Sequence, residues 1–201
     1  ALKRMTAEQL WDSLLTLIAT NEWAYQRPTA QEMQTVYGID VSTVDYEEFE
    51  QSFKDYNDYR RDLSRTRNKN CGLNGLTLVR ASELPQPSGS SHLLRQFGQG
   101  DREAIETARQ SATVPQILTL FNGWMTHAML SKGSVIYDSV SQQKTLQSAV
   151  DTIFLAILTH EPDADMRRAA EAEIKQSPNP AVGCGNLIWA LLNTREFLFI
   201  D

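Results

Sequence analysis

The residues best suited to chemistry in this chain lie close together, between positions 95 and 103. They are two arginines and two acids, with glycines among them that permit unusual backbone angles: Arg95, Gly98, Gly100, Asp101, Arg102 and Glu103. Arginine forms forked hydrogen bonds to a carboxylate, a phosphate or sugar hydroxyls, and a neighbouring acid can transfer a proton. This combination predicts a polar site in which Asp101 or Glu103 is the acid or base and Arg95 or Arg102 binds the ligand.

The same side chains also have a structural interpretation. They suit an internal ion-pair network in which Asp101 caps a helix and the pairs fix the Pro/Gly-rich backbone before it. Arg80 and Glu83, further upstream, fit either arrangement as additional binding residues. We favour the structural interpretation, because arginine–acid pairs commonly do no chemistry.

Two histidines give weaker signals. His92 follows Ser90 and Ser91, which hints at a base and a nucleophile. Adjacent residues rarely present both groups correctly, however, and the sequence has no Gly-x-Ser-x-Gly elbow. His127 has two methionines nearby, as some haem ligands do, but a histidine at the core or its rim with methionine filler is the simpler interpretation.

Cysteine and histidine content predicts no metal site and no cofactor in this segment. The sequence has no Cys-x-x-Cys-His, which excludes covalent c-type haem here, and its three histidines lack zinc-site spacing. Cys71 and Cys184 fit either two free thiols or one disulfide in an oxidising compartment. Free thiols are the simpler expectation, with Cys184 a small buried residue at the start of a helix.

Composition and charge exclude several classes of protein. The 201 residues, 41% apolar and 22% charged, fit one globular domain or two small ones. The chain has a net charge of −6 and a pI of about 5.1, so it lacks the excess of positive charge that is typical of nucleic-acid-binding proteins. No apolar run approaches the roughly 20 residues of a membrane span, and no signal peptide is visible. We expect one helical domain over residues 1–201, cut from a larger multidomain protein.

Helix signals dominate and must position the candidate residues. Capping-box pairs, Thr6 with Gln9 and Thr113 with Gln116, precede apolar stripes at helical spacing. The second pair predicts the most apolar helix, from residue 113 to about residue 133. A serine at position 90 or 91 is expected to cap a short helix that Gly98 ends. Further helices are expected over residues 7–21, 29–37, 146–161, 163–176 and 187–192.

Residues 43–65 predict a long amphipathic helix with an aromatic face. The residues of this face follow one another at intervals of three and four: Tyr46, Phe49, Phe53, Tyr56, Arg60 and Leu63. We expect the face to pack on the rest of the domain, and the alternative is a partner-binding helix or a contact between two helices. Acids come first and bases last, which suits the helix dipole, so the basic end needs no nucleic acid to explain it. Residues 66–75 predict a loop, and residues 76–79 fit a short strand or a buried extended segment.

Four blocks resemble a planctomycete-specific family, the C-terminal domain of unknown function of large exported proteins. The block at 80–103 is similar to the family's phenylalanine-glycine and aspartate-arginine-glutamate motif. The other blocks are similar to its opening helix, its proline-glutamine helix and its closing signature, and they cover residues 5–15, 113–123 and 186–199. Residues 21–75 contain no such block, which predicts a lineage-specific insertion.

The resemblance implies an extracytoplasmic setting, in the periplasm or at the cell surface, and an upstream domain that carries haem c. It supplies no catalytic residues. The expected function is therefore a non-catalytic interaction or scaffold domain that docks other domains of the parent protein or an extracellular polymer, without nucleic-acid binding or membrane insertion.

The competing function is a carbohydrate-active or other hydrolytic enzyme that uses residues 101–103. A carbohydrate site would also need aromatic platforms, for which Trp23, Tyr25 and Trp124 are the candidates. The expected fold is the same for both functions. It is mainly α, an irregular bundle of about seven to nine helices with long loops, with one short strand pair as an option.

Overall fold

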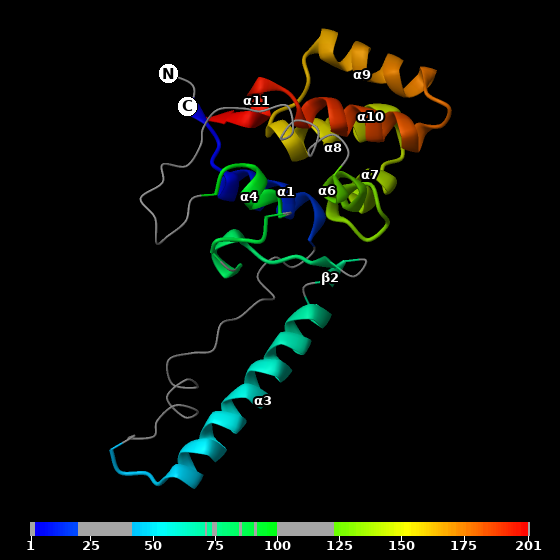
Figure 1. Cartoon of the computed structure of the whole chain (residues 1–201). Coiled ribbons are helices and arrows are strands. Elements are labelled where there is room, and N and C mark those ends of the chain that lie inside the picture. Colours follow the sequence, from blue (N-terminus) through cyan, green and yellow to red (C-terminus); the bar gives the residue numbers. More distant parts are fainter. Residues whose placement is uncertain are drawn as a thin grey trace. The chain divides into compact units, whose positions relative to one another are not determined.

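The computed structural model describes residues 3–19, 42–70, 72–73, 76–84, 86–90, 92–99 and 123–200. These residues are mainly helical, with irregular connections and short strands, so the predicted mainly α fold is confirmed (Figure 1). Contacts divide the chain into two compact units. The first unit comprises Ala1–Thr20 with Arg80–Asp201, and the second comprises Asn21–Val79.

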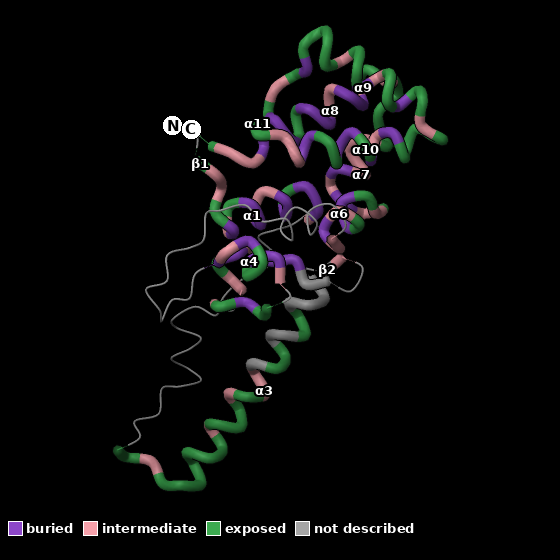
Figure 2. Tube along the Cα trace, turned by 45° about the horizontal axis from the view of Figure 1, so that its top comes forward, coloured by how far each residue is buried: buried purple, intermediate pink, exposed green. Residues whose placement is uncertain are grey.

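The first unit begins with helix α1, Ala7–Ile18, which lies in its core. The predicted capping box is present: Thr6 Oγ1 accepts from the Gln9 N–H (3.2 Å), and Gln9 Oε1 accepts from the Thr6 N–H (2.9 Å). These bonds satisfy N–H groups that a helix start leaves unpaired. The apolar stripe that follows is almost fully buried, as the purple segments of α1 show in Figure 2: Leu10, Trp11, Leu14, Leu15 and Ile18.

Three long helices pack together in the C-terminal half of the first unit: α8 (Leu146–Leu158), α9 (Ala164–Gln176) and α10 (Pro180–Leu192). Their N-termini are capped by the side chains of Thr145, Asp163 and Asn179. Helices α9 and α10 approach closely at Gly183, where an added Cβ would lie only 2.6 Å from the Ile174 Cα. Glycine at this position therefore sets how closely the two helices pack.

Shorter elements complete the first unit. They are the 3₁₀ helix η1 (Ala81–Glu83) and the helices α4 (Leu93–Gln96), α6 (Trp124–Met129), α7 (Val135–Ser141) and α11 (Arg195–Leu198). Strand β1 (Lys3–Arg4) pairs antiparallel with β4 (Phe199–Ile200), and the Met5 N–H donates to the Leu198 carbonyl at 3.0 Å. The two described ends of the chain therefore lie side by side (Figure 1).

The second unit contains helix α3, Tyr46–Asn70, and a two-stranded hairpin of β2 (Gly72–Leu73) and β3 (Leu76–Thr77). Helix α3 carries large apolar side chains in the open: Tyr46 is 76% exposed, Phe49 45% and Phe53 59%. We call these three residues the aromatic face of α3. These three side chains are therefore not buried against the rest of the domain, contrary to the expectation for this face, and most of the described length of α3 has the exposed colour in Figure 2.

The structure corrects several predicted helix boundaries, among them the start of α10, which lies at Pro180 and not at residue 187. Helix α3 continues to Asn70, so residues 66–70 are helical and not part of a loop, because no glycine or proline interrupts the segment before Gly72. The helix predicted over residues 113–133 does not run unbroken, because Gly123 is the extended N-cap of α6 (φ −73°, ψ 157°). Residues 113–122 lie outside the described part of the chain.

Two further features of the first unit depart from the prediction. Helix α7 has no predicted counterpart, and its cap Ser134 is completely buried, where it accepts from the Tyr137 N–H (3.2 Å) and donates to the Met129 carbonyl (2.6 Å). The cap of α4 is His92, and not the serine at position 90 or 91. As predicted, α4 ends at a glycine of positive φ, Gly98 (φ 91°).

Candidate functional site

The predicted charged cluster is described only in part. Arg80, Glu83 and Arg95 belong to the described residues, whereas Asp101, Arg102 and Glu103 lie outside them. Arg80 and Glu83 share the turn of η1, in which the Glu83 N–H donates to the Arg80 carbonyl at 2.9 Å. The acid–base role of Asp101 or Glu103 therefore stays a prediction.

Arg80 forms a partly buried ion pair with Asp12 of α1. Arg80 Nη2 donates to Asp12 Oδ2 at 3.3 Å, and the Ala81 N–H donates to Asp12 Oδ1 at 2.8 Å. The two side chains are 27% and 25% exposed, so water and salt screen this pair less than a surface pair. Both carboxylate oxygens of Asp12 are used, and the contact ties α1 to η1.

The remaining polar groups of this block also bond within it. Arg95 is exposed on α4, and its Nη1 donates to the Gln99 carbonyl at 3.3 Å. The buried Gln99 side chain accepts from the Ser88 N–H through Oε1 (3.0 Å), while its Nε2 finds no partner within the described residues. These contacts stabilise the backbone of the block. They hold the Arg95 side chain against the backbone that follows its own helix.

His92 combines a capping bond with ring packing. Its Nδ1 accepts from the Leu94 N–H at 3.2 Å, which places the proton of the neutral ring on Nε2. The ring centroid lies 4.6 Å from that of Trp11, and Trp124 meets Trp11 edge-on at 5.8 Å. Burial lowers the pKa of His92, which favours the neutral ring. His92 therefore stabilises α4, and Trp124 packs against another tryptophan. The other two aromatic candidates, Trp23 and Tyr25, lie outside the described residues.

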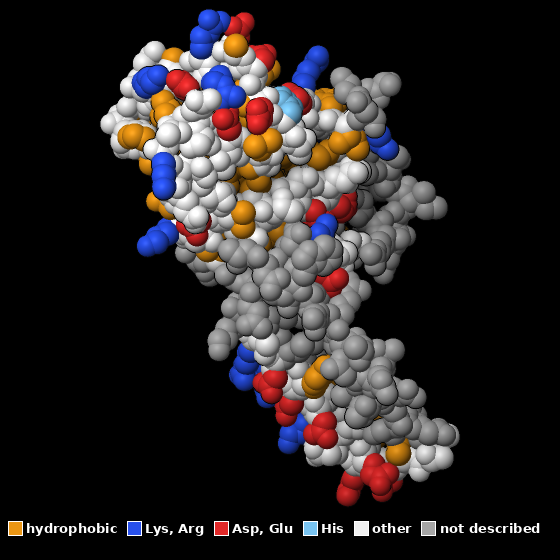
Figure 3. All heavy atoms as spheres, turned by 180° about the vertical axis from the view of Figure 1, so that it is seen from behind, with side chains coloured by type: hydrophobic (Ala, Val, Ile, Leu, Met, Phe, Trp, Pro, Cys, Tyr) orange, Lys and Arg blue, Asp and Glu red, His pale blue; other side chains and the backbone are white. Residues whose placement is uncertain are grey.

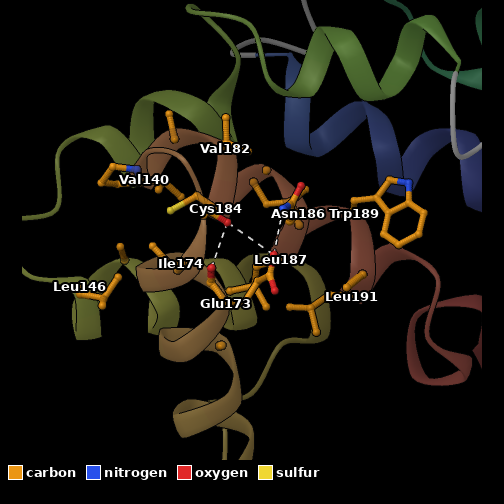
Figure 4. A pocket seen from close by; sticks show the side chains of 18 of the residues that line it. Val140, Leu146, Glu173, Ile174, Val182, Cys184, Asn186, Leu187, Trp189 and Leu191 are labelled. Atoms are coloured by element: carbon orange, nitrogen blue, oxygen red, sulfur yellow. Dashed lines mark hydrogen bonds between the residues drawn. The ribbon is translucent and has the colours of Figure 1, made fainter.

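A wide groove of about 1790 Å³ follows α10 in the first unit. Residues of α6, α7, α8, α9 and α10 line it, and we call it the α10 groove. Its wall includes partly exposed apolar side chains, namely Leu130, Met166, Val182 and Trp189. Val182 and Trp189 project from α10 away from Ile174 and Leu187, which lie between the helices (Figure 4). Figure 3 shows apolar side chains among the charged ones on one face of this unit.

Polar side chains in the α10 groove bond to one another. Asn186 Nδ2 of α10 donates to Glu173 Oε1 of α9 at 2.9 Å, and Ser177 Oγ donates to the Glu173 carbonyl at 2.9 Å (Figure 4). Lys175 Nζ and Glu171 Oε2 form an ion pair at 3.0 Å. The Glu173 carboxylate therefore links two helices, as a structural group does.

Cys184 lies inside α10 and lines the groove. It is a free thiol, in agreement with the simpler of the two expectations for the cysteines. It is half-buried and lies within α10, beyond its first turn. Burial raises the pKa of the thiol, so the protonated and weakly nucleophilic form prevails at neutral pH.

The described residues lack two kinds of feature. No three of their His, Cys, Asp and Glu side chains come together in a way that could hold a metal ion. None of their helices combines the length and the apolar character that crossing a membrane requires.

Comparison with known proteins supplies the family. The model of PSD1, protein of unknown function (DUF1553), matches residues 1–174. The chain belongs to the DUF1553 family. No curated protein and no solved structure matches it.

The DUF1553 match covers three of the four blocks on which the resemblance rests. The block at 186–199 lies beyond the matched residues. The match runs through residues 21–75, whose insertion in this lineage stays a prediction. It describes a family of unknown function and so assigns no catalytic role.

Sequence reasoning did not find the α10 groove. The available signal was the pair Val182 and Trp189, seven residues apart and therefore on one side of a helix. The opposite side carries Leu187, Ile188 and Leu191, all buried. A helix that is apolar on both sides is normally buried all round, so an exposed second side was not expected.

Proposed function

We propose that this DUF1553 chain is a non-catalytic interaction domain and that the α10 groove binds an apolar segment of another domain of its parent protein. The observation that carries the proposal is the exposure of Val182 (43%) and Trp189 (39%), which lie on one side of α10 and line the groove. Covering such side chains is favourable, by about 25 cal/mol for each Å² of apolar surface removed from water.

Polar contacts in the described residues support a binding role over a catalytic one. The carboxylates of Asp12 and Glu173 each accept hydrogen bonds from neighbouring elements. The thiol of Cys184 is held in its protonated form. A general base or nucleophile needs a group poised to react, whereas the two carboxylates are engaged between elements and burial favours the protonated thiol.

The proposed setting follows from the resemblance of the sequence blocks. We place the parent among large exported planctomycete proteins, with a haem-c domain upstream and with this domain outside the cytoplasm. The test is the complete reading frame of the parent. A secretion signal and an upstream Cys-x-x-Cys-His motif would support this setting, and a frame without them would remove it.

The groove is tested by one substitution with a matched control. Val182→Glu places a charge in the groove wall, and Leu155→Glu places the same charge on α8, where Leu155 is 47% exposed and does not line the groove. We expect Val182→Glu to weaken binding of the separately expressed remaining domains of the parent by roughly tenfold or more, because a carboxylate is desolvated when the partner covers it. Isothermal titration calorimetry measures the affinity.

Leu155→Glu should bind like the unmodified chain, and both variants should keep its circular dichroism spectrum. Equal weakening by both variants would contradict the assignment of the groove. The unmodified chain could instead bind a soluble polysaccharide and not the parent's domains. If Val182→Glu abolished that binding, the partner of the groove would be an extracellular polymer. Turnover of that polysaccharide would contradict the non-catalytic role.

A further inference from the structure

Helix α3 exposes apolar side chains that lie along one face. Tyr46, Phe49 and Phe53 are separated by three and four residues and lie on the same side of the helix. They are 76%, 45% and 59% exposed. Spacing that alternates between three and four residues is the pattern by which two helices pack along a common line. The face therefore has the form of a helix-pairing surface.

Charge is distributed unevenly along the same helix. Residues 46–57 contain four acids and one base, whereas residues 58–70 contain five bases and two acids. The two halves thus carry equal and opposite net charges. In the acidic half Glu47, Glu48 and Glu50 are exposed, and in the basic half Arg61 and Arg65 are exposed. The helix dipole favours this order within one helix, but it does not account for the exposed aromatic residues.

We propose that α3 pairs antiparallel with the α3 of a second copy of this chain. In a parallel pair the acidic halves would meet each other, and so would the basic halves. In an antiparallel pair each acidic half meets a basic half, and the two helix dipoles point in opposite directions. Antiparallel pairing follows from a two-fold axis across the helix, which makes the surface complementary to itself. Charge complementarity therefore identifies a second copy as the partner.

The position of the pairing follows from the length of the helix. Full overlap of the two copies of Tyr46–Asn70 places the axis near position 58. Position 52 of one copy then lies level with positions 64–66 of the other. The ion pairs of Arg61 with Asp58 (2.7 Å) and of Arg65 with Asp62 (3.3 Å) lie within one helix and are exposed. Such pairs contribute little, so pairing can exchange them for contacts between copies at small cost.

Self-association through α3 goes beyond the proposed binding function and does not depend on it. The aromatic face belongs to the second unit, whereas the α10 groove belongs to the first. Failure of one proposal therefore leaves the other unaffected, and each has its own substitution.

The first experiment measures the mass of the whole chain in solution. We expect a dimer by sedimentation equilibrium, with weaker association at high salt because the paired charges are exposed. Phe53→Glu should raise the dissociation constant at least about tenfold, since each dimer loses two apolar contacts and must remove two carboxylates from water where the helices meet. Gln51→Glu adds the same charge on the opposite side of α3 and should leave the mass unchanged.

The second experiment determines the orientation. Both native cysteines are first replaced by serine, and two chains are then made, one with Ser52→Cys and one with Thr66→Cys. After the two chains are mixed and oxidised, the antiparallel pair predicts mainly disulfides between the two different chains. A parallel pair would instead link each chain to its own kind. Mass spectrometry separates the three products.

Three results would overturn the proposal. One is a chain that stays monomeric at about 100 μM, where a micromolar dimer would be almost fully formed. Another is a dimer that Phe53→Glu and Gln51→Glu weaken equally, which would place the contact elsewhere. The third is predominant linkage of identical chains, which would exclude the antiparallel arrangement.

Discussion

Asp12 holds together two segments that are far apart in the sequence, and it does so with both carboxylate oxygens. It accepts from Arg80 and from the Ala81 N–H, and a quarter of its side chain is exposed. A charged hydrogen bond of this kind is worth more than a surface ion pair, because the Ala81 N–H loses its acceptor in a partly buried place when the carboxylate is removed.

We expect Asp12→Ala to lower the free energy of unfolding by about 1–3 kcal/mol. Asp62→Ala provides the comparison, because Asp62 also pairs with an arginine on a helix but both side chains are 72% exposed. Its effect should stay within about 0.5 kcal/mol. Urea unfolding followed by circular dichroism measures both variants. Similar losses in the two would show that the Asp12 contact does not stabilise the first unit.

His160 is the second residue with a measurable electrostatic role. Its Nδ1 lies 2.8 Å from the Glu161 carbonyl and its Nε2 lies 2.7 Å from Glu196 Oε1. Both partners are acceptors, so only the protonated ring can donate to both. The backbone bond to Glu161 first, and then the bond to Glu196, raise the pKa of His160.

We predict that Glu196→Gln lowers the pKa of His160, as followed by proton NMR. Because the pKa of His160 is raised in the folded chain, the stabilisation that its protonated ring contributes is fully present below the ordinary histidine pKa of about 6.5. It is lost as pH rises through the folded-state pKa. The unmodified chain should therefore exceed the variant in stability at acidic pH, and the difference should shrink as the solution becomes alkaline. A difference that grows with pH would contradict the assignment.

At the scale of elements, two glycines two residues apart in α10 should respond oppositely to the same substitution. A Cβ at Gly183 would lie 2.6 Å from the Ile174 Cα, a backbone atom that cannot move alone, whereas one at Gly185 would meet only the Leu130 methyl groups at 3.4 Å. We expect Gly183→Ala to destabilise by about 1–3 kcal/mol because α9 and α10 must separate.

Gly185→Ala should be neutral or stabilising by up to about 1 kcal/mol, since alanine favours a helix interior. Thermal unfolding measures both variants. If Gly185→Ala costs as much as Gly183→Ala, close helix packing is not the reason for glycine at position 183.

Elements with local signals were predictable from the sequence. The capping box of Thr6 and Gln9 and the capping Asp163 appear where expected, and α8 begins at the predicted Leu146. It ends earlier than expected, because Thr159 adopts a left-handed conformation (φ 64°) three residues before Pro162. A proline in the sequence marks the latest position at which a helix can stop, and not the actual one.

Features that depend on tertiary contacts could not be predicted. His92 caps α4 while it packs on Trp11, eighty-one positions away in the chain, and α7 depends on a serine that is buried beneath it. Predicting the α10 groove would require knowing which side of an apolar helix remains uncovered by the neighbouring helices. The candidate charges of residues 95–103 were visible in the sequence, but the partner that Arg80 uses, Asp12, was not among them.

At the scale of the whole molecule, the two proposed surfaces belong to different compact units. The α10 groove lies in the first unit and the aromatic face of α3 in the second. Substitutions in independent parts of a protein usually act additively. We therefore expect Val182→Glu to leave the mass of the chain in solution unchanged and Phe53→Glu to leave binding of the parent's domains unchanged, as measured by the same two methods.

The pairing of β1 with β4 has a mechanical consequence. Any polypeptide joined to Lys3 and to Ile200 would enter and leave the first unit at neighbouring positions. A pulling force along such a polypeptide would therefore act on the β1–β4 ladder first. Tension along that polypeptide would open the two-residue ladder one pair at a time, from the free end inward. The helices would carry no load until the Met5–Leu198 bond had parted.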